Sequence, residues 1–402
     1  MKILFTGGGS GGHFYPIIAV AEQLNTIVRE HHLLKPDLYY MSTEPYNPGL
    51  LFENQITFIH VTSGKIRRAI TPQNIILNFI DLFKILFGTI GALWTVFRMY
   101  PDVVFSKGAY ASFPALFAAR LLRIPVIIHE SDTEPGRVNA WAGKFAEKIA
   151  VSYPDSVRFF KPFTHPTTAK SEQWSHDQKD GDDSPSRVAY TGNPIRKELL
   201  DPLSVGAHEF LHLEENIPVV FITGGSQGAQ FINEVIMDAL PDLVKRYQII
   251  HQVGKRNIKV VEETSAVILR NSDHRDRYKP FDYLNLLSMR MSAGAADVII
   301  SRAGSTIFEI ASWGKPSIII PIPEVTSHDQ RTNAYAYARS GACQVIEEKN
   351  LTSHVLISEI DRLVSNKEER DRMSAAALAF ARRDAGQLIA EQILSIALSH
   401  EK

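Results

Sequence analysis

The stretch VIISRAGSTIFEIASWGKPSIIIPIP, residues 298–323, carries the pattern that decides the fold. Its first apolar run, 298–300, is typical of a buried parallel strand, and the polar turn 301–305 leads into a predicted helix that begins near Thr306. A second apolar run, 317–320, completes a β-α-β unit. Open α/β sheets bind ligands where the carboxyl end of a strand meets the amino end of a helix. The turn is therefore the first candidate site.

The turn and the helix after it suit a nucleotide. Free N–H groups at a helix start favour an anion such as phosphate, each interaction contributing about 0.3–1 kcal/mol. Glu309 lies one turn into the same predicted helix. A carboxylate there would repel phosphate, but it would accept hydrogen bonds from two neighbouring hydroxyls. Because a ribose carries such a pair, we expect ribose at Glu309 and phosphate at the turn.

The composition indicates a soluble globular protein of more than one domain. A chain of 402 residues exceeds the ~250–300 residues at which single hydrophobic cores stop growing. The formal net charge of -1 gives no global attraction to nucleic acid, so no nucleic-acid partner is expected. The single cysteine, Cys343, excludes a disulfide framework and suits a reducing compartment. The start, MKILFTGGG, is typical of a first strand rather than an export signal.

Two segments share the order strand, glycine-rich loop, helix. They are KILFTGGGSGGHFYP at 2–16 and VVFITGGSQGAQFINEV at 219–235. Their similarity predicts an α/β protein of two Rossmann-like domains, each a doubly wound parallel sheet. The other predicted strands are 38–41, 57–61, 103–106, 126–129, 148–152, one within RVAYTGNPIR at 187–196, 248–252, 298–301, 317–320 and 343–346.

The limits of the two domains follow from the chain between the glycine loops. A polar stretch at 165–187 is interpreted as an exposed insertion, because it lacks the apolar surface to offset its ordering entropy. The turn after it, Gly192-Asn193-Pro194, is interpreted as the hinge, and the amphipathic stretch 387–399 is expected to return to the first domain. The expected domains are residues 1–193 with 385–402, and residues 194–384.

Residues 75–97 form the most hydrophobic segment of the chain. Apolar residues lie on both sides of the predicted helix, although one sheet can cover only one side. Polar residues interrupt the run, so we do not expect the helix to span a membrane. Exposed aromatics and preceding basic residues favour peripheral contact with an anionic membrane surface, and a core helix beneath a long loop is the alternative. The polar residues are Asn78, Asp81 and Lys84, and the basic ones are Lys65, Arg67 and Arg68.

The first glycine loop ends in a candidate general base. His13 stands where a Walker A loop requires lysine, and the second predicted strand lacks the acidic tip of a nicotinamide site. The small residues Ser10, Gly11 and Gly12 let a ligand approach the backbone closely. A histidine at a helix start tends to stay neutral, so His13 could accept a proton from an attacking hydroxyl. A helix-cap or packing role is the alternative.

A second anion-binding loop is predicted at 223–229, where Ser226 and the loop amides would face a ligand. Arg196, just after the turn at 192–194, could add a full positive charge to a diphosphate. A tight turn and a surface arginine are the alternatives. If the diphosphate leaves during a reaction, the same donors would stabilise the charge that develops on it.

Seven motifs in order resemble the MurG family, bacterial glycosyltransferases that add N-acetylglucosamine to the lipid-linked muramoyl-pentapeptide of peptidoglycan synthesis. The likeness covers nearly the whole chain. The motifs are GGGSGGHFYP (7–16), FSKGAYASFPALFAA (105–119), IIHESDTEPGRVNAWAGKFA (127–146), TGNPIR (191–196), ITGGSQGA (222–229), ISRAGSTIFEIASWGKP (300–316) and HDQRTNA (328–334).

The resemblance implies a GT-B fold, in which two Rossmann-like domains face a central cleft. It further implies a UDP-N-acetylglucosamine donor held mainly by the second domain and an undecaprenyl-diphospho-muramoylpentapeptide acceptor held by the first. The enzyme would be peripheral, on the cytoplasmic face of the plasma membrane. By position, the family's roles fall on Ser226 and Arg196 at the diphosphate, Ser305 and Thr306 at the helix start, Glu309 on the ribose, Gln330 and Asn333 at the sugar hydroxyls, and Phe281 by the uracil.

Two positions depart from the family pattern. Asp132 stands where many members have asparagine, and Ala109 stands where glycine is usual, which we expect to cost flexibility. The predicted reaction is an inverting, one-step transfer in which His13 takes the proton of the acceptor's 4-hydroxyl, with no cofactor and no metal motif. The alternatives are a UDP-N-acetylglucosamine 2-epimerase, a transferase for another lipid such as diacylglycerol, and a catalytically silent sugar-nucleotide-binding protein.

Overall fold

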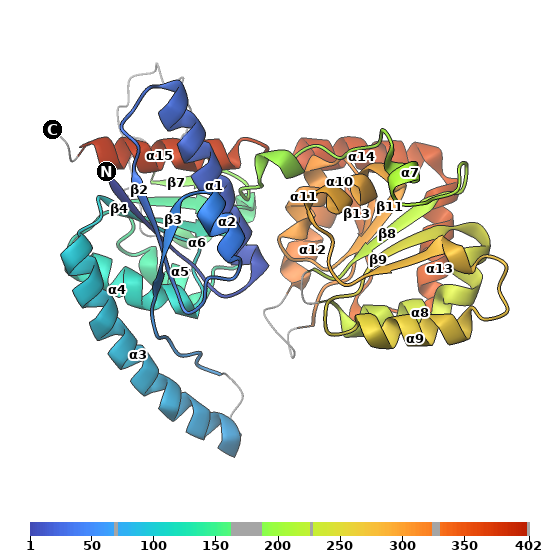
Figure 1. Cartoon of the computed structure of the whole chain (residues 1–402), viewed down its shortest axis with the longest axis horizontal. Coiled ribbons are helices and arrows are strands. Elements are labelled where there is room, and N and C mark those ends of the chain that lie inside the picture. Colours follow the sequence, from blue (N-terminus) through green and yellow to red (C-terminus); the bar gives the residue numbers. More distant parts are fainter. Residues whose placement is uncertain (68–70, 162–186, 226–227, 324–329, 400–402) are drawn as a thin grey trace. The chain divides into compact units, whose positions relative to one another are not determined.

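The computed structural model describes residues 1–67, 71–161, 187–225, 228–323 and 330–399. The chain divides into two compact units (Figure 1). One consists of Met1–Lys197 with Arg383–Lys402, and the other of Glu198–Arg382.

The first unit is built on a seven-stranded parallel sheet in the order β3-β2-β1-β4-β5-β6-β7. The order reverses between β1 and β4, which is the switch point where such sheets bind ligands. The strands are β1 (Lys2–Thr6), β2 (Asp37–Ser42), β3 (Ile56–His60), β4 (Val103–Ser106), β5 (Val126–Glu130), β6 (Lys148–Val151) and β7 (Val188–Tyr190).

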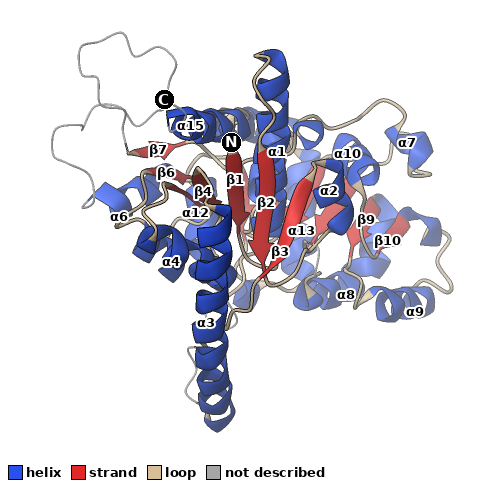
Figure 2. Ribbon diagram, turned by 60° about the vertical axis from the view of Figure 1, so that its left-hand side comes forward, coloured by secondary structure: helices blue, strands red, loops and turns tan. Residues whose placement is uncertain are grey.

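Helices cover both faces of this sheet, because successive side chains of each strand point to opposite sides. Ile3 and Phe5 pack into one core together with α1, α2 and α15, whereas Leu4 packs into the other with α3, α4, α5 and α6. Figure 2 shows the sheet between these layers. The helices are α1 (Gly11–Glu30), α2 (Pro48–Glu53), α3 (Pro72–Met99), α4 (Phe113–Leu121), α5 (Arg137–Ala142), α6 (Val157–Phe160) and α15 (Ala385–Ser399).

The second unit repeats the design with a six-stranded parallel sheet in the order β10-β9-β8-β11-β12-β13. Its strands are β8 (Val219–Thr223), β9 (Gln248–Gln252), β10 (Tyr278–Phe281), β11 (Val298–Ser301), β12 (Ser317–Ile319) and β13 (Cys343–Val345). Its helices are α7 (Ala207–Phe210), α8 (Gln230–Arg246), α9 (Ile258–Ile268), α10 (Leu286–Ala295), α11 (Thr306–Ser312), α12 (Arg331–Ala338), α13 (Ser353–Ser365) and α14 (Lys367–Phe380).

These two sheets confirm the predicted fold class, and α11 begins at Thr306 as the pattern indicated. The sequence prediction missed one strand, β10, whose residues Tyr-Lys-Pro-Phe contain no apolar run. Proline is tolerated there because β10 is the last strand of the sheet and one of its edges needs no partner.

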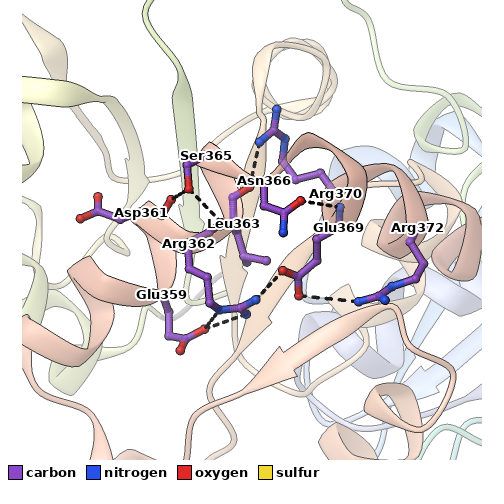
Figure 3. A network of polar contacts seen from close by, with 9 residues as sticks. All are labelled: Glu359, Asp361, Arg362, Leu363, Ser365, Asn366, Glu369, Arg370 and Arg372. Carbon is purple, nitrogen blue, oxygen red and sulfur yellow. Dashed lines mark hydrogen bonds and ion pairs between the residues drawn. The ribbon is translucent and has the colours of Figure 1, made fainter.

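The corner between α13 and α14 is fixed by polar contacts (Figure 3). Asn366 caps α14 by accepting a hydrogen bond from the Glu369 backbone N–H at 3.0 Å. The Arg362 guanidinium pairs with Glu369 at 2.5 Å and Glu359 at 2.9 Å, one carboxylate from each helix. Since Leu356 of α13 lies in the core beside α8, this corner braces one face of the second sheet.

The chain's last helix, α15, completes the first unit. It packs along α1, where a Cβ added to Gly386 would lie 3.5 Å from the carbonyl oxygen of Ala19. Ile389, Ile393 and other apolar residues of α15 join the same core as α1. The predicted return of 387–399 to the first half of the chain is therefore observed within this unit.

Helix α3 is attached to the sheet by a narrow stripe of residues. Its buried members are Asp81, Gly88, Ala92 and Val96, and the rest of the helix is partly or largely exposed. A Cβ at Gly88 would overlap the carbonyl oxygen of Thr62, so the backbone before α3 lies directly against the helix. Figures 1 and 2 show α3 extending beyond the other elements of its unit.

Polar contacts hold the segment 62–67, which we call the strap, along α3. The Arg67 backbone N–H donates to Asn78 Oδ1 at 2.8 Å, and Asn78 Nδ2 donates back to the Arg67 carbonyl at 3.1 Å. The Arg67 and Lys84 side chains both pair with Asp81, at 2.7 and 3.1 Å. Two of the polar residues that interrupt the hydrophobic run, Asn78 and Asp81, thus bind the strap, and the third, Lys84, pairs with Asp81.

Among the described residues, α3 is the one helix whose length and composition would suffice to cross a membrane. Only 17% of its most apolar window is buried in the protein. Our sequence argument against a spanning helix rested on Asn78, Asp81 and Lys84, which do not lower the apolar character enough to exclude it on composition. The contacts of these residues with the strap are what argue against spanning, because a spanning helix would carry the strap into the hydrocarbon.

Candidate functional site

The predicted phosphate turn of the second unit lies at the carboxyl end of β11, against the start of α12. Ser305 and Thr306 are half-buried at the start of α11, and Glu309 lies in the first turn of that helix. Within the described residues, a Cβ at Gly304 would meet Gln330 Nε2 alone, at 3.7 Å, so the Gln330 side chain lies over the turn. The structure therefore brings these three predicted residues and Gln330 to one place.

Two side chains fix the position of this turn. Asn333 is 2% exposed, and its Nδ2 donates to the carbonyl of Ala303 at 3.2 Å. Arg302 donates to the carbonyl of Ile320 at 3.2 Å and pairs with Glu348 at 2.5 Å. Burial lowers the pKa of the Arg302 guanidinium, and the hydrogen bond and charge of Glu348 act in the opposite direction. Asn333, predicted at the sugar hydroxyls, braces the backbone of the turn in this structure.

The second glycine loop follows β8 and is closely packed. Gly225 and Gly228 have φ angles of 78° and 75°, a region that favours glycine. A Cβ at Gly228 would overlap the carbonyl oxygen of Val253, and Gln252 Nε2 donates to the Gly225 carbonyl at 3.2 Å. The loop is thus tied to the end of β9. Ser226, the predicted phosphate contact, lies outside the described residues.

Phe281 ends the edge strand β10, where its carbonyl accepts a hydrogen bond from Val253 N–H at 2.9 Å. Its backbone therefore lies next to the end of β9, where Phe281 is opposite Gln252 in the parallel strand pair. This places Phe281 at the same edge of the sheet as the second glycine loop.

In the first unit, His13 lies in the first turn of α1, at the carboxyl end of β1. His13 Nδ1 and Ser10 Oγ are 2.7 Å apart, so the imidazole is oriented by the residue at the N-cap of its own helix. Gly11 and Gly12 belong to the same first turn. A Cβ at Gly11 would lie 2.9 Å from the Tyr46 hydroxyl, which explains why a residue without a side chain is needed there.

A carboxylate lies over this first glycine loop, where sequence analysis had placed none. A Cβ at Gly9 would overlap the side-chain oxygen of Glu44. A carboxylate at this point disfavours an anion and favours hydroxyl or amide donors. The first loop is therefore better suited to a sugar or peptide than to phosphate.

Arg196 belongs to the first compact unit, and its guanidinium carbon lies 4.9 Å from the centre of the Tyr15 ring. Because Tyr15 is two residues after His13 in α1, this cation-π contact links the arginine to the helix that carries the candidate base. Arg196 is half-buried in this position.

A buried polar cluster lies beneath the first glycine loop, and sequence analysis missed it. The Lys107 amine is bonded to His129 Nδ1 at 2.5 Å, Ser131 Oγ at 2.5 Å and Asn193 Oδ1 at 3.2 Å. His129 Nε2 lies 2.9 Å from the Gly192 carbonyl, which can only accept, so Nε2 carries the hydrogen and Nδ1 accepts from Lys107. We call Lys107, His129, Ser131 and Asn193 the lysine cluster.

Glu130 lies beside the lysine cluster and accepts backbone hydrogen bonds from Asp132 and Gly136, each at 3.0 Å. Burial lowers the pKa of Lys107, and the Glu130 charge opposes that shift. Burial also raises the pKa of Glu130. Asp132, the departure from the family pattern, thus contributes its backbone N–H to Glu130. Charged residues directly after buried strands were the signal in the sequence that could have pointed here.

Both halves of the chain match glycosyltransferase family 28. Residues 3–151 match its N-terminal domain and residues 219–389 its C-terminal domain. The chain is 35% identical over 372 residues to the UDP-N-acetylglucosamine--N-acetylmuramyl-(pentapeptide) pyrophosphoryl-undecaprenol N-acetylglucosamine transferase of Clostridium novyi, covering 92% of each chain. The enzyme of the same name from Treponema denticola is 30% identical, over 98% of this chain and 97% of that one.

Solved structures share the fold at lower identity. Acinetobacter baumannii MurG superposes with a TM-score of 0.68 at 23% identity, covering 98% of this chain and 99% of that chain. UDP-GlcNAc 2-epimerases also share the fold. The Neisseria meningitidis enzyme bound to UDP-GlcNAc reaches 0.65 at 14% identity. Identities this low show that the proteins share a fold and nothing more. The shared fold does not distinguish the transferases from the epimerases.

Proposed function

This chain belongs to glycosyltransferase family 28, among the MurG-type N-acetylglucosamine transferases, and we propose that it transfers N-acetylglucosamine from UDP-N-acetylglucosamine to the 4-hydroxyl of a lipid-linked muramoyl-pentapeptide. The observation that carries this proposal is the match, over nearly the full length, to transferases named for that reaction. UDP-GlcNAc 2-epimerases share this fold, so the fold alone does not decide between transfer and epimerisation. The choice of transfer rests on the relatives.

In the proposed reaction the acceptor oxygen attacks the anomeric carbon, the bond from that carbon to the UDP oxygen breaks, and the configuration inverts. His13 Nε2 takes the hydroxyl proton. This role requires the His13 Nδ1–H to donate to Ser10 Oγ, since only then does Nε2 carry a lone pair. The electron pair of the broken bond leaves on UDP, whose diphosphate needs donors for the charge.

The donor is assigned to the second unit. Ser305 and Thr306 offer hydroxyl and backbone donors to a phosphate, and Glu309 offers acceptors to the ribose hydroxyls. The loop at 224–229 and Arg196 are assigned to the diphosphate, and Gln330 to the sugar. Phe281 is assigned to the uracil because it ends the strand beside that loop. Asn333 is assigned to the sugar site indirectly, because its side chain holds the backbone of the turn at Ala303.

We further propose that α3 contacts the membrane that holds the lipid acceptor, as a peripheral contact on the cytoplasmic side. The exposed aromatics of α3 supply the apolar surface, and Lys65 is exposed close by. Arg67 and Lys84 share the carboxylate of Asp81, so these three residues together carry a single positive charge. Arg68 lies outside the described residues. Apolar burial therefore supplies more of the proposed affinity than charge does.

One assay separates the proposed reaction from its alternatives. Purified protein is incubated with labelled UDP-N-acetylglucosamine alone, with the muramoyl-pentapeptide lipid, or with diacylglycerol. We expect labelled lipid product only when the acceptor is present. Label converted to another UDP-sugar without acceptor would indicate an epimerase, transfer to diacylglycerol would indicate another acceptor, and binding without turnover would indicate a silent protein.

Glu309→Gln should weaken donor binding about 10- to 100-fold, because charge-assisted hydrogen bonds contribute about 1.5–3 kcal/mol. We expect the KM for UDP-N-acetylglucosamine to rise while kcat at saturating donor falls little. Steady-state kinetics and calorimetric titration with UDP measure the two effects. Glu262→Gln, on the exposed surface of α9, is the matched control. An unchanged donor KM would remove Glu309 from the ribose site.

Ser10→Ala should lower kcat about 2- to 10-fold, since the variant loses one hydrogen bond to the imidazole, worth about 0.5–1.5 kcal/mol. The donor KM should not change, because Ser10 contacts the His13 imidazole, whereas the donor contacts are assigned to Arg196 and to residues of the second unit. Initial rates at varied donor concentration test this. A change in donor KM alone would assign Ser10 to donor binding.

A further inference from the structure

The buried lysine cluster lies outside every role assigned above, although it adjoins the loop of the candidate base. Lys107 is 2% exposed and follows β4 directly. Its amine has three acceptors, the number of hydrogens that an ammonium carries. Those acceptors come from two places far apart in the sequence, the end of β5 with the residue that follows it, and the turn after β7. Lys107 therefore pins three strand ends of the sheet together.

A continuous set of contacts runs from Lys107 to the imidazole of His13. The Lys107 backbone N–H donates to the Thr6 carbonyl at 2.9 Å, at the end of β1. A Cβ at Gly8 would lie 2.5 Å from Ala109 Cβ and 3.6 Å from His13 Nδ1. The Gly8 backbone is thus enclosed between the Ala109 methyl group and the imidazole ring. Any movement of residues 107–109 would move the loop that supports the base.

The turn after Lys107 is strained. Ala109 has φ 67° and ψ 170°, a conformation that is largely confined to glycine and costs about 1–3 kcal/mol for other residues. The cost of alanine here is thus strain, whereas the sequence had suggested lost flexibility. Gly108, with φ 80°, packs on the Asn139 amide, which donates to the His129 carbonyl and to Glu130, both at 3.0 Å. Such a conformation persists only when its surroundings hold it.

We propose that Lys107 is a positioning residue for the transfer reaction: bonded to His129, Ser131 and Asn193, it holds the strained turn Gly108–Ala109 against Gly8 and thereby fixes the orientation of His13. This inference rests on the proposed function, in which His13 is the base. Lys107 acts through the loop and touches no substrate.

The test is a double-mutant cycle between Lys107→Met and His13→Ala. Lys107→Met keeps the length of the side chain and removes the amine. We expect it to lower kcat about 10- to 100-fold with an unchanged KM for UDP-N-acetylglucosamine, because small misplacements of a catalytic group cost up to about 10²-fold. In the His13→Ala background the same substitution should have almost no further effect on kcat.

The cycle has a matched control and a second variant. Lys148, also buried, lies in β6 of the same sheet at the amino-terminal end, so Lys148→Met should leave kcat unchanged. Thermal unfolding and circular dichroism check that each variant folds. Should Lys107→Met not fold, Ser131→Ala carries the same test, since it removes one of the three acceptors of the Lys107 amine and should lower kcat only when His13 is present.

Each outcome is decisive. A folded Lys107→Met enzyme with normal kcat overturns the proposal, and so does an equal loss of kcat with and without His13. If His13→Ala itself leaves kcat intact, the assignment of the base has failed, independently of Lys107. If Lys107→Met raised the donor KM and left kcat constant, Lys107 would support donor binding and not the orientation of His13. That result would also overturn the proposal.

Discussion

His13→Ala should lower turnover about 10²- to 10⁴-fold, the usual contribution of a general base, while UDP-N-acetylglucosamine still binds with its normal dissociation constant. We expect turnover to fall without a change in donor binding because His13 lies in the first unit. The turn at 301–305, Glu309 and Gln330, which are assigned to the donor, lie in the second. Loss of the imidazole removes the proton acceptor for the attacking hydroxyl and leaves the donor contacts intact. Steady-state transfer to the lipid acceptor gives kcat, and calorimetric titration with donor gives the dissociation constant.

The control for this variant is His31→Ala, an exposed histidine just after the other end of α1. It should leave both quantities unchanged, which would exclude a general effect of altering the helix. Weaker donor binding by His13→Ala with turnover nearly intact would make His13 a binding residue, and the proton acceptor would then be a different group.

Replacing four aromatics of α3 with serine should abolish co-sedimentation with vesicles that contain phosphatidylglycerol. The residues are Phe79, Phe83, Phe87 and Trp94, whose side chains are 62%, 46%, 66% and 62% exposed. Burying such a side chain contributes about 1.5–3 kcal/mol, so their combined loss should exceed about 6 kcal/mol. These residues do not belong to the buried stripe of α3, and we therefore expect the fold to be kept.

Phe52→Ser is the matched control, because Phe52 is an 85% exposed aromatic of the same unit outside α3. It should leave vesicle binding unchanged. Activity on a detergent-solubilised or truncated acceptor should survive the fourfold substitution, since the proposed site of chemistry lies elsewhere. Undiminished vesicle binding by the α3 variant would rule out this helix as the membrane contact.

The strands of both sheets could be predicted because a strand covered on both faces must be apolar along its whole length. β10 escaped this rule, since a free edge tolerates Lys279 and Pro280. The helix at 75–97 and its uncovered apolar side were also predicted, but the strap was not. The Thr62 carbonyl and the Arg67 side chain lie against this helix, and a sequence does not indicate that a strap, in addition to a sheet, will cover a helix.

The candidate site was predictable where one short segment contains it. Glu309 and Thr306 lie in α11 as the spacing indicated, because strand, turn and helix are adjacent in sequence. The burial of Lys107 was missed, because a lysine is usually solvated, although its place directly after a buried strand was a signal in the sequence. Its acceptors on Ser131 and Asn193 meet it only after β4, β5 and β7 have assembled. The roles of these residues in catalysis stay predictions for the variants above.

The docking of α15 on α1 sets an order for biosynthesis. The second unit is continuous in sequence, whereas the first lacks one of its core helices until Ala385–Ser399 leave the ribosome. The 185 residues from Glu198 to Arg382 separate the two parts. At roughly 5–20 residues per second this is a delay of about 10–40 s. During that interval the apolar side of α1 has no permanent cover. The unit translated first is thus the last to mature, and chaperones would meet this nascent chain at α1.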